Sequence, residues 1–326
     1  MVLFLKDKYI WDFWIAQEDR DYHIFYLQAS RSLEDPNLRH WNVSIGHAVS
    51  QDLHNWFVLP NTLSPNKEPS WDDYTTWTGS IIFRQGLWYM LYTGGSRFEN
   101  GQVQRIGLAT SKDLTHWERH PKNPVIEADS RWYEILDQNP NQEQVWRDPY
   151  IFKHPDDGGY HSLITARIPS GPSNHRGVIA HVRSQDLIHW ESSSPITAPG
   201  RYGYMEVPQW IEIRGRFYLL YSVPSWVHSN SYYEQSGREA LTGTYYMVAE
   251  NPLGPFQFSS EKTLYADDIG SQYAGKLVKG PQSELYFLSW TQYSVGGTFV
   301  GEIADPLPVT IRENGDLFIE PHVKTL

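Results

Sequence analysis

The stretch IGLATSKDLTHW at residues 106–117 has two close copies elsewhere in the chain. They are IGHAVSQDLHNW at 45–56 and IAHVRSQDLIHW at 179–190, and all three share Ile, Ser, Asp, Leu and Trp at the same offsets. Weaker copies, in which the strand survives and the following turn differs, begin at Met247 and Val300. A unit that recurs five times indicates a repeat architecture.

Two apolar runs precede each copy. The nearer run is rich in aromatic and branched residues, as β-strands are, and it begins at residues 22, 87, 160, 216 and 284. Turn-forming sequences such as HPDDGG at 154–159 connect it to the run before it. The farther runs are YIWDFWI, TTWTGSIIF, QVWRDPYIF, YMEVPQWIEI and GSQYAGKLV.

Antiparallel units repeated radially form a β-propeller, so five units predict an all-β protein with a five-bladed β-propeller. No linker or low-complexity tract interrupts the series, and we expect residues 1–326 to form one catalytic domain. The segment 2–6 is a candidate outer strand for the fifth blade, whose own last segment, DLFIEP at 316–321, is short.

The repeated Asp and Trp residues are expected to be structural. Aspartate at such a turn accepts hydrogen bonds from nearby backbone N–H groups, and Trp residues that recur around a ring fit blade packing better than binding of a single ligand. These residues are Asp52, Asp113 and Asp186, with Trp56, Trp117 and Trp190.

Composition excludes several classes of partner. The chain has 326 residues, no cysteine and a formal net charge of -11. It lacks the clustered Lys and Arg of a nucleic-acid surface. Its start, MVLFLKDKYIW, does not resemble a secretory signal, and no later run is as long as a membrane span. We therefore expect a cytoplasmic protein with neither nucleic-acid nor membrane partners, and the sequence makes no prediction about its oligomeric state.

Three of the farther runs carry a carboxylate at nearly the same place. Asp12, Asp148 and Glu206 lie 10 to 12 residues ahead of the next apolar run. Because the first strand of each blade lines the central channel, these acids should meet at one mouth of it at matched heights. Thr78 and Gln272 are expected near the same level in the other two blades.

Gathered carboxylates push one another's pKa values apart, which suits a reaction that needs one proton donor and one ionised carboxylate. Cleavage of a glycosidic bond is such a reaction. A small saccharide is therefore the predicted substrate. We predict no cofactor and no metal, because HWERH at 116–120 and HPDDGG at 154–159 lack the context of zinc and calcium sites.

The motifs together resemble glycoside hydrolase family 32, the fructosidases and invertases, within a clan of five-bladed propellers that includes families 43 and 68. The resemblance rests on the segment from YIWDFWI to YLQ, on WTGSIIF, WRDPYIF, YMEVPQW and DIGSQYAGKL, and on the repeats, and it runs from about residue 9 to about residue 290.

The resemblance implies a role for each candidate residue. Asp12 would be the nucleophile, Glu206 the general acid and then the general base, and Asp148 the residue that stabilises the transition state. The residues implied in substrate binding are Trp11, Gln28, Trp77, Arg147 and Tyr273, with Gln28 displaced by one position from the glutamine of the family.

This chain also departs from the family pattern. Asp12 is flanked by Trp11, Phe13 and Trp14 instead of asparagine, proline and glycine, and Val207 replaces the cysteine that commonly follows the acid. The carboxy-terminal β-sandwich of the family is expected to be missing. The identity of the sugar is therefore open. Two alternatives also remain: an inverting arabinofuranosidase or xylosidase similar to family 43, with Asp12 as general base, and a propeller that binds sugar without turnover.

Overall fold

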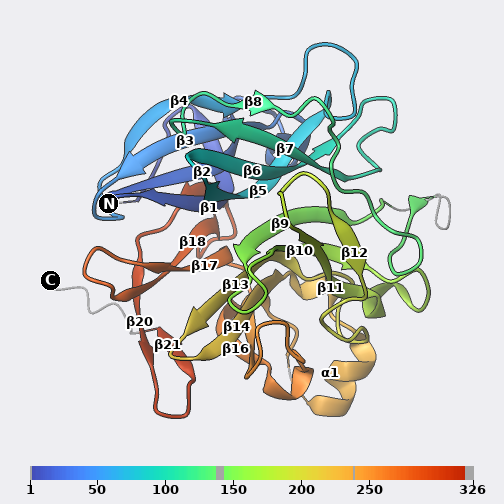
Figure 1. The fold of residues 1–326 in the computed structure, drawn as a ribbon. Helices are drawn as coiled ribbons and strands as arrows, with labels where there is room; N and C mark the ends of the chain where they lie inside the picture. Colours follow the sequence, from blue (N-terminus) through green and yellow to red (C-terminus); the bar gives the residue numbers. More distant parts are fainter. Residues whose placement is uncertain (1, 137–142, 238, 320–326) are drawn as a thin grey trace, which may run out of the picture.

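The computed structural model describes residues 2–136, 143–237 and 239–319. Strands among these residues form five antiparallel sheets that follow one another around a common centre, from blue to red in Figure 1. The first strands of neighbouring sheets contact one another, and β1 also contacts the first strand of the fifth sheet, β17. The predicted five-bladed β-propeller is thereby confirmed.

The first three sheets have four strands each, in chain order from the channel outward. The first sheet consists of β1 (Lys8–Glu18), β2 (Asp21–Ser30), β3 (Ser44–Ser50) and β4 (Phe57–Leu63). The second consists of β5 (Thr75–Arg84), β6 (Leu87–Gly95), β7 (Arg105–Ser111) and β8 (Glu118–Arg119). The third consists of β9 (Trp146–Lys153), β10 (Tyr160–Arg167), β11 (Gly177–Ser184) and β12 (Glu191–Ser193).

The fourth sheet repeats this order, whereas in the fifth sheet two short strands, β19 and β20, both pair with β18. The fourth sheet consists of β13 (Glu206–Ile213), β14 (Arg216–Val223), β15 (Thr242–Ala249) and β16 (Lys262–Asp267). The fifth consists of β17 (Gln272–Lys279), β18 (Leu285–Tyr293), β19 (Phe299–Ile303), β20 (Leu307–Ile311) and β21 (Leu317–Ile319).

Among the residues that the structure describes, helical structure is confined to short connections. No helix among the described residues has the length and apolar character needed to cross a membrane. The helical segments are η1 (Pro36–Trp41), η3 (Ser173–His175), η4 (Ser225–Val227), η5 (Phe258–Ser260) and α1 (Asn230–Ser236).

The core lies between adjacent sheets. One cluster joins Leu91 and Leu108 of the second sheet to Ile164 and Val182 of the third. Because each sheet packs against a neighbour on both faces, the second strands are buried almost without interruption, as in β10. This explains why those strands are nearly continuous apolar runs in the sequence.

The repeated aspartates cap turns, as predicted. Asp113 accepts hydrogen bonds from the backbone N–H groups of Thr115 and His116, both at 2.8 Å, and these bonds hold the pKa of its carboxyl well below the ordinary value. Asp52 and Asp186 make the same contacts in their own sheets. The repeated Trp residues pack against the core, also as predicted.

The chain closes the ring by joining its first residues to the fifth sheet. Leu3 pairs with Ile303 of β19 through two backbone hydrogen bonds of 3.1 Å. The guanidinium of Arg31, which directly follows β2, donates to the carbonyls of Leu5 and Lys8. Across the joint it also donates to those of Val300 and Gly301, and all four distances are within 3.0 Å. The predicted contribution of segment 2–6 to the fifth blade is confirmed at Leu3.

Candidate active site

A β-bulge interrupts every inner strand at the same level of the channel. At each bulge the pairing with the second strand skips one or two residues, which turns their side chains or backbone toward the channel. The skipped residues are Asp12, Thr78, Asp148 with Pro149, Val207 with Pro208, and Ala274 with Gly275. Asp148, Val207 and Ala274 have φ values of 59°, 49° and 51°, in the left-handed region.

The three carboxylates are not quite level, which corrects the prediction of matched heights. Asp12 and Asp148 lie in their bulges, whereas Glu206 pairs with Ser222 one position before its bulge. Glu206 is thus level with Trp11 and with Arg147. Counting residues back from the second strand could not reveal this, because a bulge changes the count without changing the apolar pattern.

These residues line one pocket of about 300 Å³. Six of the eight residues predicted from the sequence contribute to its wall: Trp11, Asp12, Trp77, Arg147, Asp148 and Glu206. Acids more than a hundred positions apart in the chain therefore face the same space, because the five inner strands bring the same level of each sheet to a common centre.

Asp12 is half-buried between the first and fifth sheets. Its Oδ1 accepts the indole N–H of Trp290 at 2.8 Å, and its Oδ2 lies 3.5 Å from the hydroxyl of Thr78. Burial, together with the charges of Asp148 and Glu206, raises the pKa of Asp12 to about 7. Its protonation state therefore changes near neutral pH.

Asp148 is held from the second, third and fourth sheets. Its Oδ2 accepts the hydroxyl of Thr165 at 3.1 Å and the backbone N–H of Val207 at 3.2 Å. Its own backbone N–H donates to the hydroxyl of Thr93 at 2.9 Å. These bonds retain the unusual backbone conformation of Asp148 and aim its carboxylate at the pocket.

Glu206 lies between a cation and a phenol. Its Oε1 accepts Nη2 of Arg147 at 2.7 Å, and its Oε2 accepts the hydroxyl of Tyr273 at 2.6 Å. Burial raises the pKa of Glu206, and Asp148 adds to this effect, although Arg147 opposes it. Arg147 also lies 3.3 Å from Glu143 and 3.8 Å from Asp148, so its charge is shared among three carboxylates.

The sequence matches the model of the Glycosyl hydrolases family 32 N-terminal domain over residues 15–296. The chain belongs to glycoside hydrolase family 32. The match begins three residues after Asp12, consistent with the unusual aromatic surroundings of that residue. It includes the segments that carry Arg147, Asp148, Glu206 and Tyr273.

Curated relatives support the same family membership. The family 32 chain is 28% identical over 335 residues to a β-fructofuranosidase, insoluble isoenzyme CWINV5, of Arabidopsis thaliana, with 94% of this chain and 54% of that protein covered. The chain therefore spans about half the length of that relative.

Solved structures share the fold of the family 32 chain. An inulosucrase from Halalkalicoccus jeotgali bound to kestose superposes with a TM-score of 0.78 at 20% identity, covering 97% of this chain and 87% of the other. Fructan 1-exohydrolase IIa from Cichorium intybus superposes with a TM-score of 0.71, also at 20% identity, covering 99% and 60%.

Two residues predicted for the family 32 site do not line the pocket. Gln28 is buried in β2, where its amide donates to Asn61 at 2.7 Å, and the preceding residue, Leu27, lines the pocket instead. Successive side chains of a strand point to opposite faces, so a displacement of one position turns the side chain away. Tyr273 does not line the pocket, and it contacts the site through its hydrogen bond to Glu206. Gln272, expected near the carboxylates, instead accepts the hydroxyl of Ser289.

The sequence reasoning missed the part of the wall that comes from connections. His40 and Trp41 belong to η1, and Trp41 stacks on Tyr74 with ring centroids 5.1 Å apart. Gln104 and Glu143 enter because Val103 and Gln144 form a parallel bridge. The only feature of the sequence that could have indicated these residues was an aromatic and polar loop outside the repeated unit. Thr78, which was expected at the level of the carboxylates, also lines the pocket. The wall residues that were not predicted are Leu27, His40, Trp41, Gln104, Glu143 and Tyr204.

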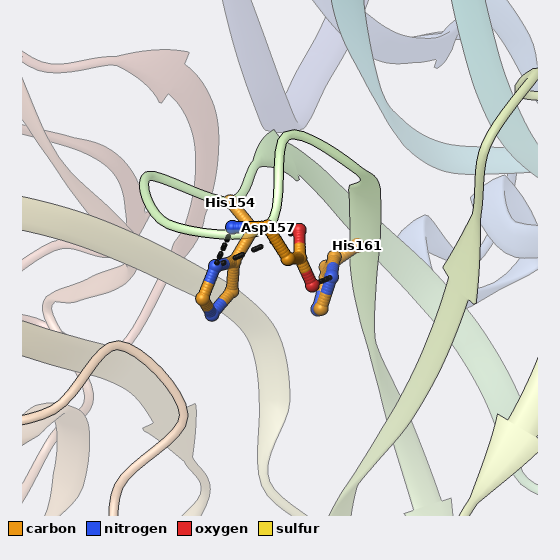
Figure 2. Close-up of side chains that lie close together, drawn as sticks. All are labelled: His154, Asp157 and His161. Atoms are coloured by element: carbon orange, nitrogen blue, oxygen red, sulfur yellow. Dashed lines mark hydrogen bonds and ion pairs between the residues drawn. The ribbon is translucent and has the colours of Figure 1, made fainter.

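A second polar group lies in the turn between β9 and β10 (Figure 2). His154 Nδ1 accepts the backbone N–H groups of Asp156 and Asp157, and His161 Nε2 bonds to the Asp157 carboxylate at 3.0 Å. The rings of His154 and His161 are tilted by 33° with their centroids 4.6 Å apart. This group stabilises the hairpin.

Proposed function

We propose that this family 32 chain is a glycoside hydrolase that cleaves a small soluble furanoside, in the manner of a β-fructofuranosidase. The observation that carries the proposal is the meeting of Asp12, Asp148 and Glu206 in one pocket of about 300 Å³. This volume is at the small end of the range for ligand sites and suits a single sugar unit better than a polymer.

In the proposed retaining reaction, the neutral Glu206 donates its proton to the leaving oxygen while the ionised Asp12 attacks the anomeric carbon. A covalent glycosyl–enzyme intermediate forms. Glu206, now a carboxylate, removes a proton from water, which displaces Asp12 and releases the sugar. Asp148 accepts hydrogen bonds from sugar hydroxyls as positive charge develops on the ring.

The surroundings of Glu206 support its role. Arg147 and Tyr273 fix both oxygens of the carboxyl group, while burial raises its pKa and so favours the proton-bearing form. Trp77, whose indole N–H is bonded to the carbonyl of His40 at 2.9 Å, adds a fixed apolar wall. Trp11 narrows the space beside Asp12. A rigid, partly apolar pocket of this kind favours one orientation of a sugar ring.

One observation favours an inverting reaction as a second candidate. Burial and neighbouring charges raise the pKa of Asp12 to about 7, a value suited to a general base that activates water at neutral pH. In that case the role of Asp148 would be to adjust the pKa of Glu206. The two acting carboxyl groups would then lie roughly 6.5–9.5 Å apart, rather than roughly 5–5.5 Å as in a retaining enzyme.

The deciding experiment is NMR of the first product formed from a panel of sucrose, fructo-oligosaccharides, arabinosides and xylosides. We expect release of fructose with retained anomeric configuration. The variants Asp12→Asn and Glu206→Gln should abolish turnover, whereas Glu212→Gln, an exposed change on the same strand as Glu206, should not. Inverted product would favour the second candidate, and saturable sugar binding without turnover would favour a binding protein. The cytoplasmic location stays a prediction.

A further inference from the structure

One part of the pocket wall comes from two connections that lie side by side. Val103 and Gln144 form a parallel bridge, the first ahead of β7 and the second ahead of β9. The residues next to them, Gln104 and Glu143, both line the pocket. Two segments far apart in the chain therefore build a polar edge that belongs to none of the repeated strands.

The side-chain amide of Gln104 orients the Glu143 carboxylate. Gln104 is fully buried, and its Oε1 accepts the backbone N–H of Trp146 at 3.1 Å and Nη1 of Arg147 at 3.2 Å. Two donors on one side identify that atom as the oxygen, so Nε2 faces Glu143 and donates to its Oε2 at 3.2 Å. Nη1 of Arg147 donates to Oε1 of Glu143 at 3.3 Å. Both oxygens of Glu143 are thus held in place.

Glu143 lies nearer the mouth of the pocket than two of the other carboxylates. Its side chain is 43% exposed, whereas those of Glu206 and Asp148 are 20% and 5% exposed. Each carboxylate oxygen can accept more than one hydrogen bond. The bonds to Gln104 and Arg147 therefore leave Glu143 able to accept hydrogen bonds from a ligand.

The position of Glu143 beside Glu206 indicates which part of a substrate it meets. One guanidinium holds both carboxylates, with Nη1 of Arg147 on Glu143 and Nη2 on Glu206 at 2.7 Å. In the proposed reaction Glu206 protonates the leaving oxygen, and the unit attached to that oxygen departs away from the nucleophile. The retained sugar occupies the pocket, so the leaving unit lies at the mouth, beside Glu143.

The charge of the wall restricts the kind of leaving unit. Among the described residues that line the pocket, Arg147 is the only cation, and its charge is already shared among carboxylates. His40 is neutral near neutral pH, because burial and the charges of Arg39 and Arg147 lower its pKa to about 3. A carboxylate accepts hydrogen bonds from sugar hydroxyls and repels the phosphate of a sugar phosphate.

We propose that Glu143, oriented by Gln104, binds hydroxyl groups of the leaving unit and restricts the enzyme to uncharged saccharides. This inference rests on the proposed function. If Glu143 only supported Arg147, its removal would alter Glu206 equally for every substrate. The ratio of kcat/KM for two substrates that share the same scissile bond therefore separates the two roles, because any change at Glu206 cancels in it.

Sucrose and sucrose with a phosphate at C6 of its glucose unit test the inference. Both release fructose through the same bond, and only the leaving unit differs. Wild type should prefer sucrose by at least about thirtyfold in kcat/KM, and Glu143→Gln, which removes the charge and keeps the size, should reduce this preference about tenfold. Glu127→Gln is the matched control. Glu127 pairs with Arg105, is 64% exposed and does not line the pocket, so the wild-type ratio should persist.

Inhibition by free fructose gives a second readout. Fructose takes the place of the retained sugar, so its inhibition constant in Glu143→Gln should stay within about twofold of wild type. Equal kcat/KM of wild type for the two substrates, or an unchanged ratio in Glu143→Gln, would overturn the inference and leave the proposed function intact.

Inactivity of the wild-type chain on every substrate would instead defeat the proposed function. Calorimetric binding of the same two sugars to wild type and to Glu143→Gln then decides the inference. Tighter binding of sucrose than of its phosphate by wild type, with a smaller difference in the variant, would support it. Equal binding of the two sugars, or binding of neither, would overturn it.

Discussion

Trp290 of β18 donates its indole N–H to Oδ1 of Asp12 on β1 at 2.8 Å, although the two residues are 278 positions apart in the chain. The bond crosses the joint at which the last sheet meets the first. It stabilises the ionised carboxylate and so opposes the burial that raises the pKa of Asp12. Closure of the ring therefore influences the acidity of Asp12 as well as the stability of the fold.

Replacing Trp290 by phenylalanine should keep an aromatic ring in place and remove this hydrogen bond. We expect the pKa of Asp12 to rise and the acid limb of kcat/KM to move upward, with a loss of about tenfold at pH 6 and a smaller loss at pH 8. Trp88→Phe is the control, because the indole N–H of Trp88 has no partner in the described structure. Equal effects of both substitutions would contradict the prediction.

Asp12→Asn should abolish activity and stabilise the fold above neutral pH. The folded-state pKa of Asp12 is raised from 3.8 to about 7, so the folded protein binds this proton more tightly than the unfolded chain. Wild type therefore loses stability as pH rises from about 4 to about 7. Asparagine does not titrate, and the variant escapes this loss.

Urea unfolding at pH 4.5 and pH 8 tests the Asp12→Asn prediction. The variant should exceed wild type by about 1–3 kcal/mol at pH 8, less than the full value for a shift of this size because Asp12 is only half-buried. The advantage should shrink at pH 4.5. Asp7→Asn, a change at an exposed residue, serves as the control. If Asp12→Asn were less stable than wild type at pH 8, the prediction would be wrong.

Glu143→Gln should change the pKa of Glu206 indirectly, through Arg147. Glu143 lies 3.3 Å from Nη1 of Arg147, and Glu206 lies 2.7 Å from Nη2. Loss of the Glu143 charge leaves Arg147 freer to stabilise the Glu206 carboxylate, so the pKa of Glu206 should fall. The alkaline limb of kcat/KM should then move to lower pH. An unchanged or upward-moving limb, measured beside Glu212→Gln, would refute this.

Arg31→Met should weaken the closure of the ring. Four backbone carbonyls lose their guanidinium partner, two of them on the fifth sheet. Hydrogen bonds to a charged group contribute about 1.5–3 kcal/mol each, but they are not additive here because water can reach part of the site. We expect a loss of about 2–4 kcal/mol by urea unfolding, with kcat/KM nearly unchanged at low temperature. The exposed Arg20→Met should show no such loss.

The repeat made the architecture readable from the sequence. Three copies of the segment that ends in Trp, each preceded by two apolar runs, were enough to predict five sheets, the hairpins and the turn-capping role of Asp113. The candidate carboxylates were readable for the same reason. Asp12, Asp148 and Glu206 lie in the first apolar run of their units at nearly equal spacing from the next run. A charge in such a run is costly to bury unless it has a function.

The tertiary structure alone decided three features of the site. They are the exact level of Glu206 in the channel, the presence of Leu27 instead of Gln28 in the pocket wall, and the hydrogen bond from Lys276 to the carbonyl of Val207. Periodicity and spacing are local properties, and they establish which segments are strands and in what order the sheets follow. A ring closure, or a hydrogen bond from a buried lysine to the neighbouring sheet, depends on groups from different sheets. Its geometry exists only when the five inner strands are brought around one centre.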